Sequence, residues 1–230
     1  LDLLGDRDAH VRLAALLALS DLPTHEQTGA ALVSMWKRQS HYRDRWTPDA
    51  FVSAAAINGG GFLTALGSTD ADEKLEEMVR VVAEHFARGG DSDSVPAVVA
   101  ALVDAQPEII HAAVTGMQDG WPAGNPVKLE VGLEQKLLQL VDKLDPTHRG
   151  SLIKLAQNWG SQEFEAYGRK ASLELLERLD NESLDIRDRL SAAREVVQLR
   201  SKDEGIVGEL LGRIDHQIDS KLASGIIESL

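Results

Sequence analysis

Apolar side chains recur at intervals of three and four residues along almost the whole chain, and alternation with a period of two is rare. The first such stripe consists of Val11, Ala14, Ala15, Ala18, Leu19 and Leu22. This spacing places apolar side chains on one side of an α-helix, whereas a half-buried strand needs alternation. The chain is therefore predicted to be all-α.

Turn residues divide this pattern into about a dozen helices. Asp8 is the candidate N-cap of the first helix, and Pro23 follows its end. Ser94 is a candidate cap further along, with Pro96 in the first turn of its helix. Residues 120–128 contain two prolines and two glycines and are expected to form an irregular loop. Later helices are expected at about 25–39, 48–58, 62–66, 71–87, 95–105, 107–118, 129–144, 147–159, 162–179, 184–199, 204–214 and 218–229.

One local pattern repeats at the start of helices rich in small residues. Asp6 precedes Arg12 by six positions, Asp215 precedes Lys221 by the same spacing, and a looser copy starts at Asp185. This pattern is typical of HEAT repeats. In such repeats the aspartate accepts hydrogen bonds from backbone amides and pairs with a basic residue of the neighbouring unit, and the alanines let helices approach closely.

Helical hairpins of this kind cannot bury their apolar faces alone, so they stack on one another. We expect residues 1–230 to form a single domain, a HEAT/armadillo-like right-handed superhelix of stacked helical hairpins. A compact, non-repeating helical bundle is the alternative. Because the pattern runs into both ends, we also expect the chain to be a segment of a longer multidomain polypeptide whose neighbouring domains cover the apolar ends.

Charge and composition narrow the classes of partner. The chain has 37 acidic and 24 basic residues and a net charge of -13, which argues against a general nucleic-acid binder and against binding to anionic membranes. It has no cysteine, so disulfides, thiolate zinc sites and covalently attached haem are excluded within it. No apolar stretch approaches ~18 residues and no signal-peptide pattern is present, so we expect no direct insertion into a membrane.

The sequence contains no recognisable catalytic constellation. None of the seven histidines lies at metal-ligand spacing from another on one helix, and there is no GxSxG elbow. Gly59–Gly61 follow no strand and precede no P-loop lysine, so a turn between helices is favoured over a phosphate site. The acidic residues at 73–84 alternate with bases as on a solvated helix face. We therefore predict no catalytic, cofactor-binding or metal-binding residue in this segment.

One polar and aromatic cluster is a candidate contact with a partner protein. It lies in a loop between helices, where solenoids often present binding residues. Arginine, tyrosine and tryptophan are the residue types that most often anchor interfaces. The alternative is that the tryptophan packs into the core and the arginines pair with nearby acids. The cluster consists of His41, Tyr42, Arg43, Arg45 and Trp46.

Several stretches in this order resemble one protein family. They are Asp6 to Pro23, Arg45 to Ala50, Gly120 to Pro126, Leu155 to Ser161, Ala192 to Arg200 and the unit that starts at Asp215. This order is similar to the HEAT-repeat segment of large bacterial envelope proteins, over nearly the whole chain. That family has a glucose/sorbosone-dehydrogenase-like propeller before the repeats and a cytochrome c-type haem domain, with a CxxCH motif, after them.

The resemblance implies a non-catalytic scaffold or protein-interaction module that positions redox domains within a larger membrane-bound dehydrogenase or haem-binding protein. Haem c would then belong to a neighbouring domain, and the location would be the cell envelope or periplasm. No catalytic residue of that family maps onto this segment. A free-standing HEAT-repeat adaptor that grips a partner protein on its concave face is the alternative. An enzyme built on such repeats, a DNA-repair glycosylase or a bilin lyase, is less favoured because the chain is acidic and nothing indicates a pigment pocket.

Overall fold

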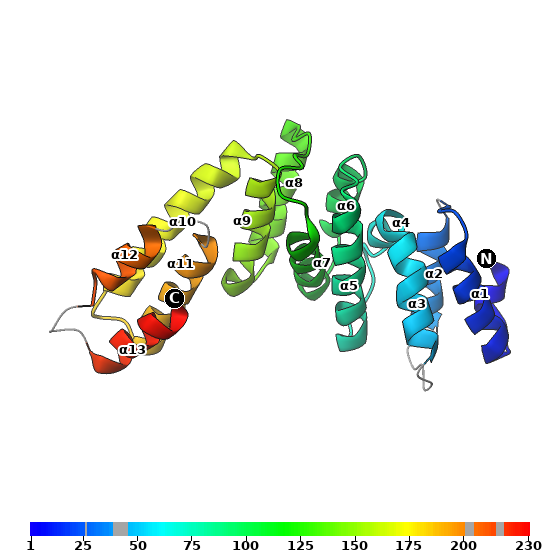
Figure 1. The fold of residues 1–230 in the computed structure, drawn as a ribbon, viewed down its shortest axis with the longest axis horizontal. Coiled ribbons are helices and arrows are strands. Elements are labelled where there is room, and N and C mark those ends of the chain that lie inside the picture. The colour runs from blue at the N-terminus through cyan, green and yellow to red at the C-terminus, as the bar shows by residue number, and fades with distance from the viewer. Residues whose placement is uncertain (26, 39–45, 201–204, 215–218) are drawn as a thin grey trace. The chain divides into compact units, whose positions relative to one another are not determined.

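The computed structural model describes residues 1–25, 27–38, 46–200, 205–214 and 219–230. Within these ranges the chain forms thirteen α-helices and two short 3-10 helices, and it forms no strand (Figure 1). The prediction of an all-α protein is thereby confirmed.

The helices group into two compact units. The first unit contains Leu1–Asp145 and Asn158–Gly160, and the second contains Pro146–Gln157 and Ser161–Leu230. The helices of the first unit are η1 (Asp2–Gly5), α1 (Ala9–Asp21), α2 (Thr28–Arg38), α3 (Trp46–Ile57), α4 (Gly59–Thr64), α5 (Glu73–Gly89), α6 (Val95–Leu102), α7 (Pro107–Gly120) and α8 (Val131–Lys143). Those that follow are η2 (Pro146–His148), α9 (Arg149–Asn158), α10 (Gln162–Asp180), α11 (Ile186–Leu199), α12 (Gly205–Leu211) and α13 (Ser220–Ser229).

In the first unit each helix packs mainly against the helix two places further along the chain. α1 contacts α3, α3 contacts α5 and α5 contacts α7. α2 likewise contacts α4, α4 contacts α6 and α6 contacts α8. The odd-numbered and the even-numbered helices therefore form two rows, which can be followed from blue to green in Figure 1.

Glycines allow some of these helices to meet at the backbone. A Cβ atom on Gly29 of α2 would lie 2.1 Å from the carbonyl carbon of Gly61 on α4. This contact explains a difference from the sequence prediction, in which Gly59–Gly61 form a turn. They instead form the first turn of α4, because the missing side chains let α2 pack directly against it.

Helix starts are stabilised largely by residues close in sequence. Asp8 accepts a hydrogen bond from the backbone N–H of His10 at 2.8 Å and caps α1, as predicted. Ser94 stands at the N-cap of α6, but its hydroxyl donates to the Asp91 carboxylate at 2.5 Å and makes no cap hydrogen bond. The predicted cap position is therefore correct, and its side-chain interaction is different.

Buried aromatic rings join the elements of the first unit. Trp36, Phe51 and Phe62 form a row across α2, α3 and α4, with centroid separations of 5.5 and 5.9 Å. Further along, the rings of Trp121 and Trp159 meet edge to face at 5.4 Å. The Trp121 indole donates to the carbonyl of Asn125 at 2.7 Å and thereby fixes the segment between α7 and α8, which has no helix.

The second unit has its own apolar core. α10 packs against α11, α11 against α13, and α12 against α13. The buried members of the core are Leu175, Leu176, Leu179, Ala192, Ala193, Val196, Ile206, Leu210, Leu222 and Ile226. Gly225 allows the closest of these approaches, since a Cβ there would lie 2.4 Å from a methyl carbon of Leu190.

Candidate functional site

One residue of the predicted partner-contact cluster, Trp46, is described by the structure. His41, Tyr42, Arg43 and Arg45 are outside the described residues. Trp46 is the first residue of α3, and 64% of its surface is exposed. Its ring is therefore accessible to a partner, and the role of the cluster in partner binding stays a prediction.

Trp46 differs from the other three tryptophans of the chain. Trp36, Trp121 and Trp159 are 3%, 6% and 1% exposed. These three belong to the apolar core, where a large ring removes much apolar surface from water. Tryptophan is one of the residue types enriched at interface hot spots, so the exposed ring of Trp46 is a candidate contact with a partner.

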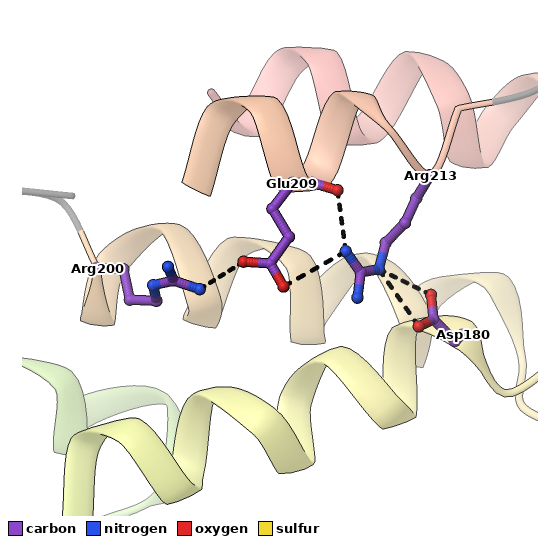
Figure 2. A network of polar contacts seen from close by, with 4 residues as sticks. All are labelled: Asp180, Arg200, Glu209 and Arg213. Carbon is purple, nitrogen blue, oxygen red and sulfur yellow. Dashed lines mark hydrogen bonds and ion pairs between the residues drawn. The ribbon is translucent and has the colours of Figure 1, made fainter. Parts of the chain in front are cut away.

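A second candidate feature is a chain of charged side chains in the second unit, which contains Asp180, Arg200, Glu209 and Arg213 (Figure 2). Arg200 donates to Glu209 Oε2 at 2.6 Å. Arg213 donates through Nε to both carboxylate oxygens of Asp180, at 3.0 and 3.3 Å. These contacts join the ends of α10 and α11 to α12, and we refer to the four residues as the charged network.

Arg213 also contacts Glu209, so the charged network is continuous. Its guanidinium donates to the Glu209 carbonyl at 2.9 Å and lies 3.6 Å from Oε1 of the same residue. The two arginine side chains are 25% and 28% exposed, so water reaches this network. Ion pairs that are exposed to this degree can orient helices relative to one another, and dissolved salt weakens the attraction between their charges.

A shallow pocket of about 210 Å³ lies between the start of α9, the middle of α10 and the end of α11. Side chains of both charges line it, with two arginines and two glutamates beside one tyrosine. Because the two charges balance, this lining favours contact with protein side chains rather than with a strongly charged ligand. The principal lining residues are Arg149, Arg178, Glu174, Glu195 and Tyr167, together with the apolar Ile153, Leu175 and Leu199.

In two exposed pairs among the described residues, the pairing shifts the pKa of at least one member. The Lys128 ammonium lies 2.8 Å from Glu130, which raises the pKa of the lysine and lowers the pKa of the glutamate. Hydrogen bonds from His10, first from its backbone N–H and then from its ring, lower the pKa of the Asp8 carboxyl. Each shift favours the charged form, which is what ion pairing and capping do; a general acid or base needs the opposite tuning.

The described residues contain no group of three or more His, Asp or Glu side chains placed to hold a metal ion. In the same part of the chain no helix combines the length and the apolar character needed to cross a bilayer. Comparisons with protein families, with curated proteins and with solved structures each find no match to this chain.

Sequence reasoning did not identify the charged network. One signal was available, because Glu209 and Arg213 are four residues apart, the spacing of an ion pair on a helix. The contact of Arg213 with Asp180 spans 33 positions and had no local signal. Only the packing of α12 beside the end of α10 creates it.

Proposed function

We propose that this chain is a non-catalytic helical-repeat scaffold of the HEAT/armadillo type, built from stacked helical hairpins, and that it binds protein surfaces. The alternating helix contacts of the first unit are the observation that carries this proposal. In a stack of hairpins each helix contacts its equivalent in the next hairpin, which produces two rows. A non-repeating bundle has no reason to maintain this order over eight successive helices.

Two helix starts with the same local geometry support a repeated unit. Asp8 and Asp185 are both N-caps, and each accepts a hydrogen bond from the backbone N–H two residues later. An arginine follows each by four positions and donates to backbone carbonyls, Arg12 to Asp6 at 2.8 Å and Arg189 to Leu179 at 2.7 Å. An aspartate cap and an arginine four residues later are thus common to α1 and α11, and the arginine contacts the segment before its own helix in the first case and the end of α10 in the second.

The surface of α1 supports a role in contact with protein. Its residues are apolar around most of its circumference, and Leu16 is its one buried residue. Ala14, Leu17 and Ala18 share an exposed face, where Leu17 is 52% exposed. Helices with apolar residues on all sides are normally covered, so this face is suited to another protein surface.

The wider context rests on the sequence resemblance alone. It suggests that the scaffold positions a dehydrogenase-like propeller and a haem c domain of one large envelope protein. The other domains of that protein would then be the binding partners, and the chain would not bind nucleic acid. A free-standing adaptor that binds a separate protein on its concave face is the second candidate, and the exposed face of α1 is compatible with it.

Photo-crosslinking in the source organism tests both candidates. Benzoylphenylalanine replaces Leu17 in one variant and Trp46 in another, and Leu173 in a control. Leu173 is 62% exposed but lies on the charged side of α10, beside Lys170 and Glu174. Crosslinks from position 17 or 46 to other domains of the same polypeptide support the scaffold, and crosslinks to a separate protein support the adaptor. Yields no higher than at position 173 would contradict a binding role for both sites.

Two further measurements address the context and the architecture. An antibody against this segment recovers the native protein, whose mass and covalent haem are then measured. A mass far above 25.0 kDa with haem retained after denaturation supports the redox context, whereas a mass near 25.0 kDa without haem contradicts it.

For the isolated chain, small-angle scattering should give a radius of gyration above the ~17 Å of a compact globule of this length. A smaller radius would contradict the stacked repeat.

A further inference from the structure

The short helix α12 has little intrinsic tendency to form. It has seven residues, and helices of this length are unstable in isolation. Gly205 begins it, Gly208 lies within it and Gly212 follows it directly. Glycine disfavours helix because its unfolded backbone is unusually free. The space around Gly208 is open to 4 Å, so no close packing requires a glycine there. Tertiary contacts must therefore hold α12 in its helical form.

The apolar contacts of α12 come from one of its faces. Ile206 and Leu210, one turn apart, are 3% and 0% exposed and belong to the core of the second unit. Val207 and Leu211, also one turn apart, are 41% and 45% exposed on another face. Two side chains of α12 thus belong to the buried core, and Ile214 just after the helix packs against it.

The charged network supplies a second kind of attachment. Glu209 within α12 pairs with Arg200 at the C-cap of α11, and Arg213 just after α12 pairs with Asp180 at the end of α10 (Figure 2). The two links act at different places, so together they fix both the position and the direction of the short helix. Because water reaches these charges, dissolved ions compete with them.

We propose that α12 is a detachable helix, held by the charged network, that opens independently of the rest of the second unit and uncovers part of its apolar core. Elements with few buried contacts open at lower free energy than the domain around them. Loss of helix and loss of docking are coupled here, because α12 has neither the length nor the composition to stay helical alone. Ionic strength therefore controls how often this apolar surface is exposed.

Hydrogen exchange on the whole chain, followed by mass spectrometry, measures this opening. The reporting amides are those of Gly212, Arg213 and Ile214, which donate to carbonyls within α12. After correction for intrinsic rates, raising the salt concentration from about 20 mM to about 500 mM should accelerate their exchange by about threefold to tenfold. The amides of α10 should keep their rates.

Two variants and a control make the test specific. Asp180→Asn should accelerate exchange in α12 at low salt and reduce the response to added salt. Glu177→Gln is the matched control, because Glu177 is an exposed acid on the same helix with no ion pair in the described structure. Gly208→Ala, which fills open space and favours helix, should slow exchange in α12 by about fivefold.

The proposal is overturned if exchange in α12 responds neither to salt nor to Gly208→Ala. It is also overturned if α10 and α12 always exchange at one common rate, since the second unit then opens as a whole. If Asp180→Asn unfolds the second unit, the amides of α10 also lose their protection from exchange. The salt series and Gly208→Ala then still test whether α12 opens independently. None of these outcomes depends on the scaffold function.

Discussion

Gly116 of α7 lies directly against the carbonyl oxygen of Arg80 on α5, and a Cβ atom on Gly116 would stand 2.1 Å from that oxygen. One turn later the same relationship recurs, since a Cβ on Gly120 would stand 2.3 Å from the carbonyl oxygen of Glu84. The two helices therefore meet backbone to backbone along a full turn. No side chain can be added there unless the helices move apart.

Gly116→Ala should destabilise the first unit by about 1–3 kcal/mol, the usual cost of overpacking, although alanine is the better helix former. Gly132→Ala in α8 is the matched control, because nothing lies within 4 Å of that site. It should leave stability unchanged or raise it by up to about 1 kcal/mol. Urea unfolding compares the two variants. Equal stability of Gly116→Ala and the natural protein would show that α5 and α7 are not packed this closely.

The tryptophans should differ sharply in their effect on stability. Trp159→Ala should cost about 3–5 kcal/mol, because the ring is 1% exposed and its removal leaves a cavity beside Trp121. Trp46→Ala should change stability by less than about 1 kcal/mol, since the ring is largely exposed. Thermal unfolding followed by circular dichroism measures both. A large loss in Trp46→Ala would instead identify that ring as part of the core, the alternative the sequence left open.

Thr69 presents a buried hydroxyl with no hydrogen-bond partner among the described residues. The side chain is 1% exposed, so the hydroxyl is also removed from solvent. Thr69→Val keeps the shape and removes the polar atom, and we expect it to stabilise the protein by about 1 kcal/mol. Thr69→Ser is the control that keeps the hydroxyl and loses the methyl group, and it should destabilise. If both variants destabilise equally, the hydroxyl has a partner.

Asp8 should titrate below its ordinary value of 3.8, because His10 donates hydrogen bonds to the carboxylate in the folded state. A lowered pKa means that ionised Asp8 stabilises α1 above about pH 3.8 and that this contribution is lost as the pH falls through the folded-state pKa. Carboxyl NMR measures the shift. His10→Ala should raise the pKa only partway, since the backbone N–H is the larger cause. A full return to 3.8 in that variant would assign the shift to the imidazole instead.

Most helix positions followed from residues close together in the sequence. The spacing predicted a helix at 71–87 with a break at Gly89 and Gly90, and α5 extends from Glu73 to Gly89. Gly90 then ends it in the left-handed conformation, at a φ of 64°. Capping and helix termination involve neighbours within four residues, so the sequence pattern is sufficient to predict them.

The candidate site was less predictable. Trp36 and Trp46 are the same residue type, one within a predicted helix and one in a predicted loop, and residue type alone does not indicate that the first is buried and the second exposed. Their difference depends on which helices pack over each ring. The contact between Asp180 and Arg213 likewise needs α12 to dock beside the end of α10. No periodicity in either segment contains that information.

By itself, the sequence determined that this chain is helical, where most helices begin and end, and that Asp8 caps the first of them. The tertiary structure alone decided that Gly59–Gly61 form a helical turn against α2, that Trp46 is exposed while Trp36 is buried, and that Arg213 pairs with Asp180 across 33 positions. The physical reason is the distance along the sequence over which each interaction acts. Backbone hydrogen bonds and caps act between near neighbours, whereas burial and ion pairing depend on which surfaces meet after the chain has packed.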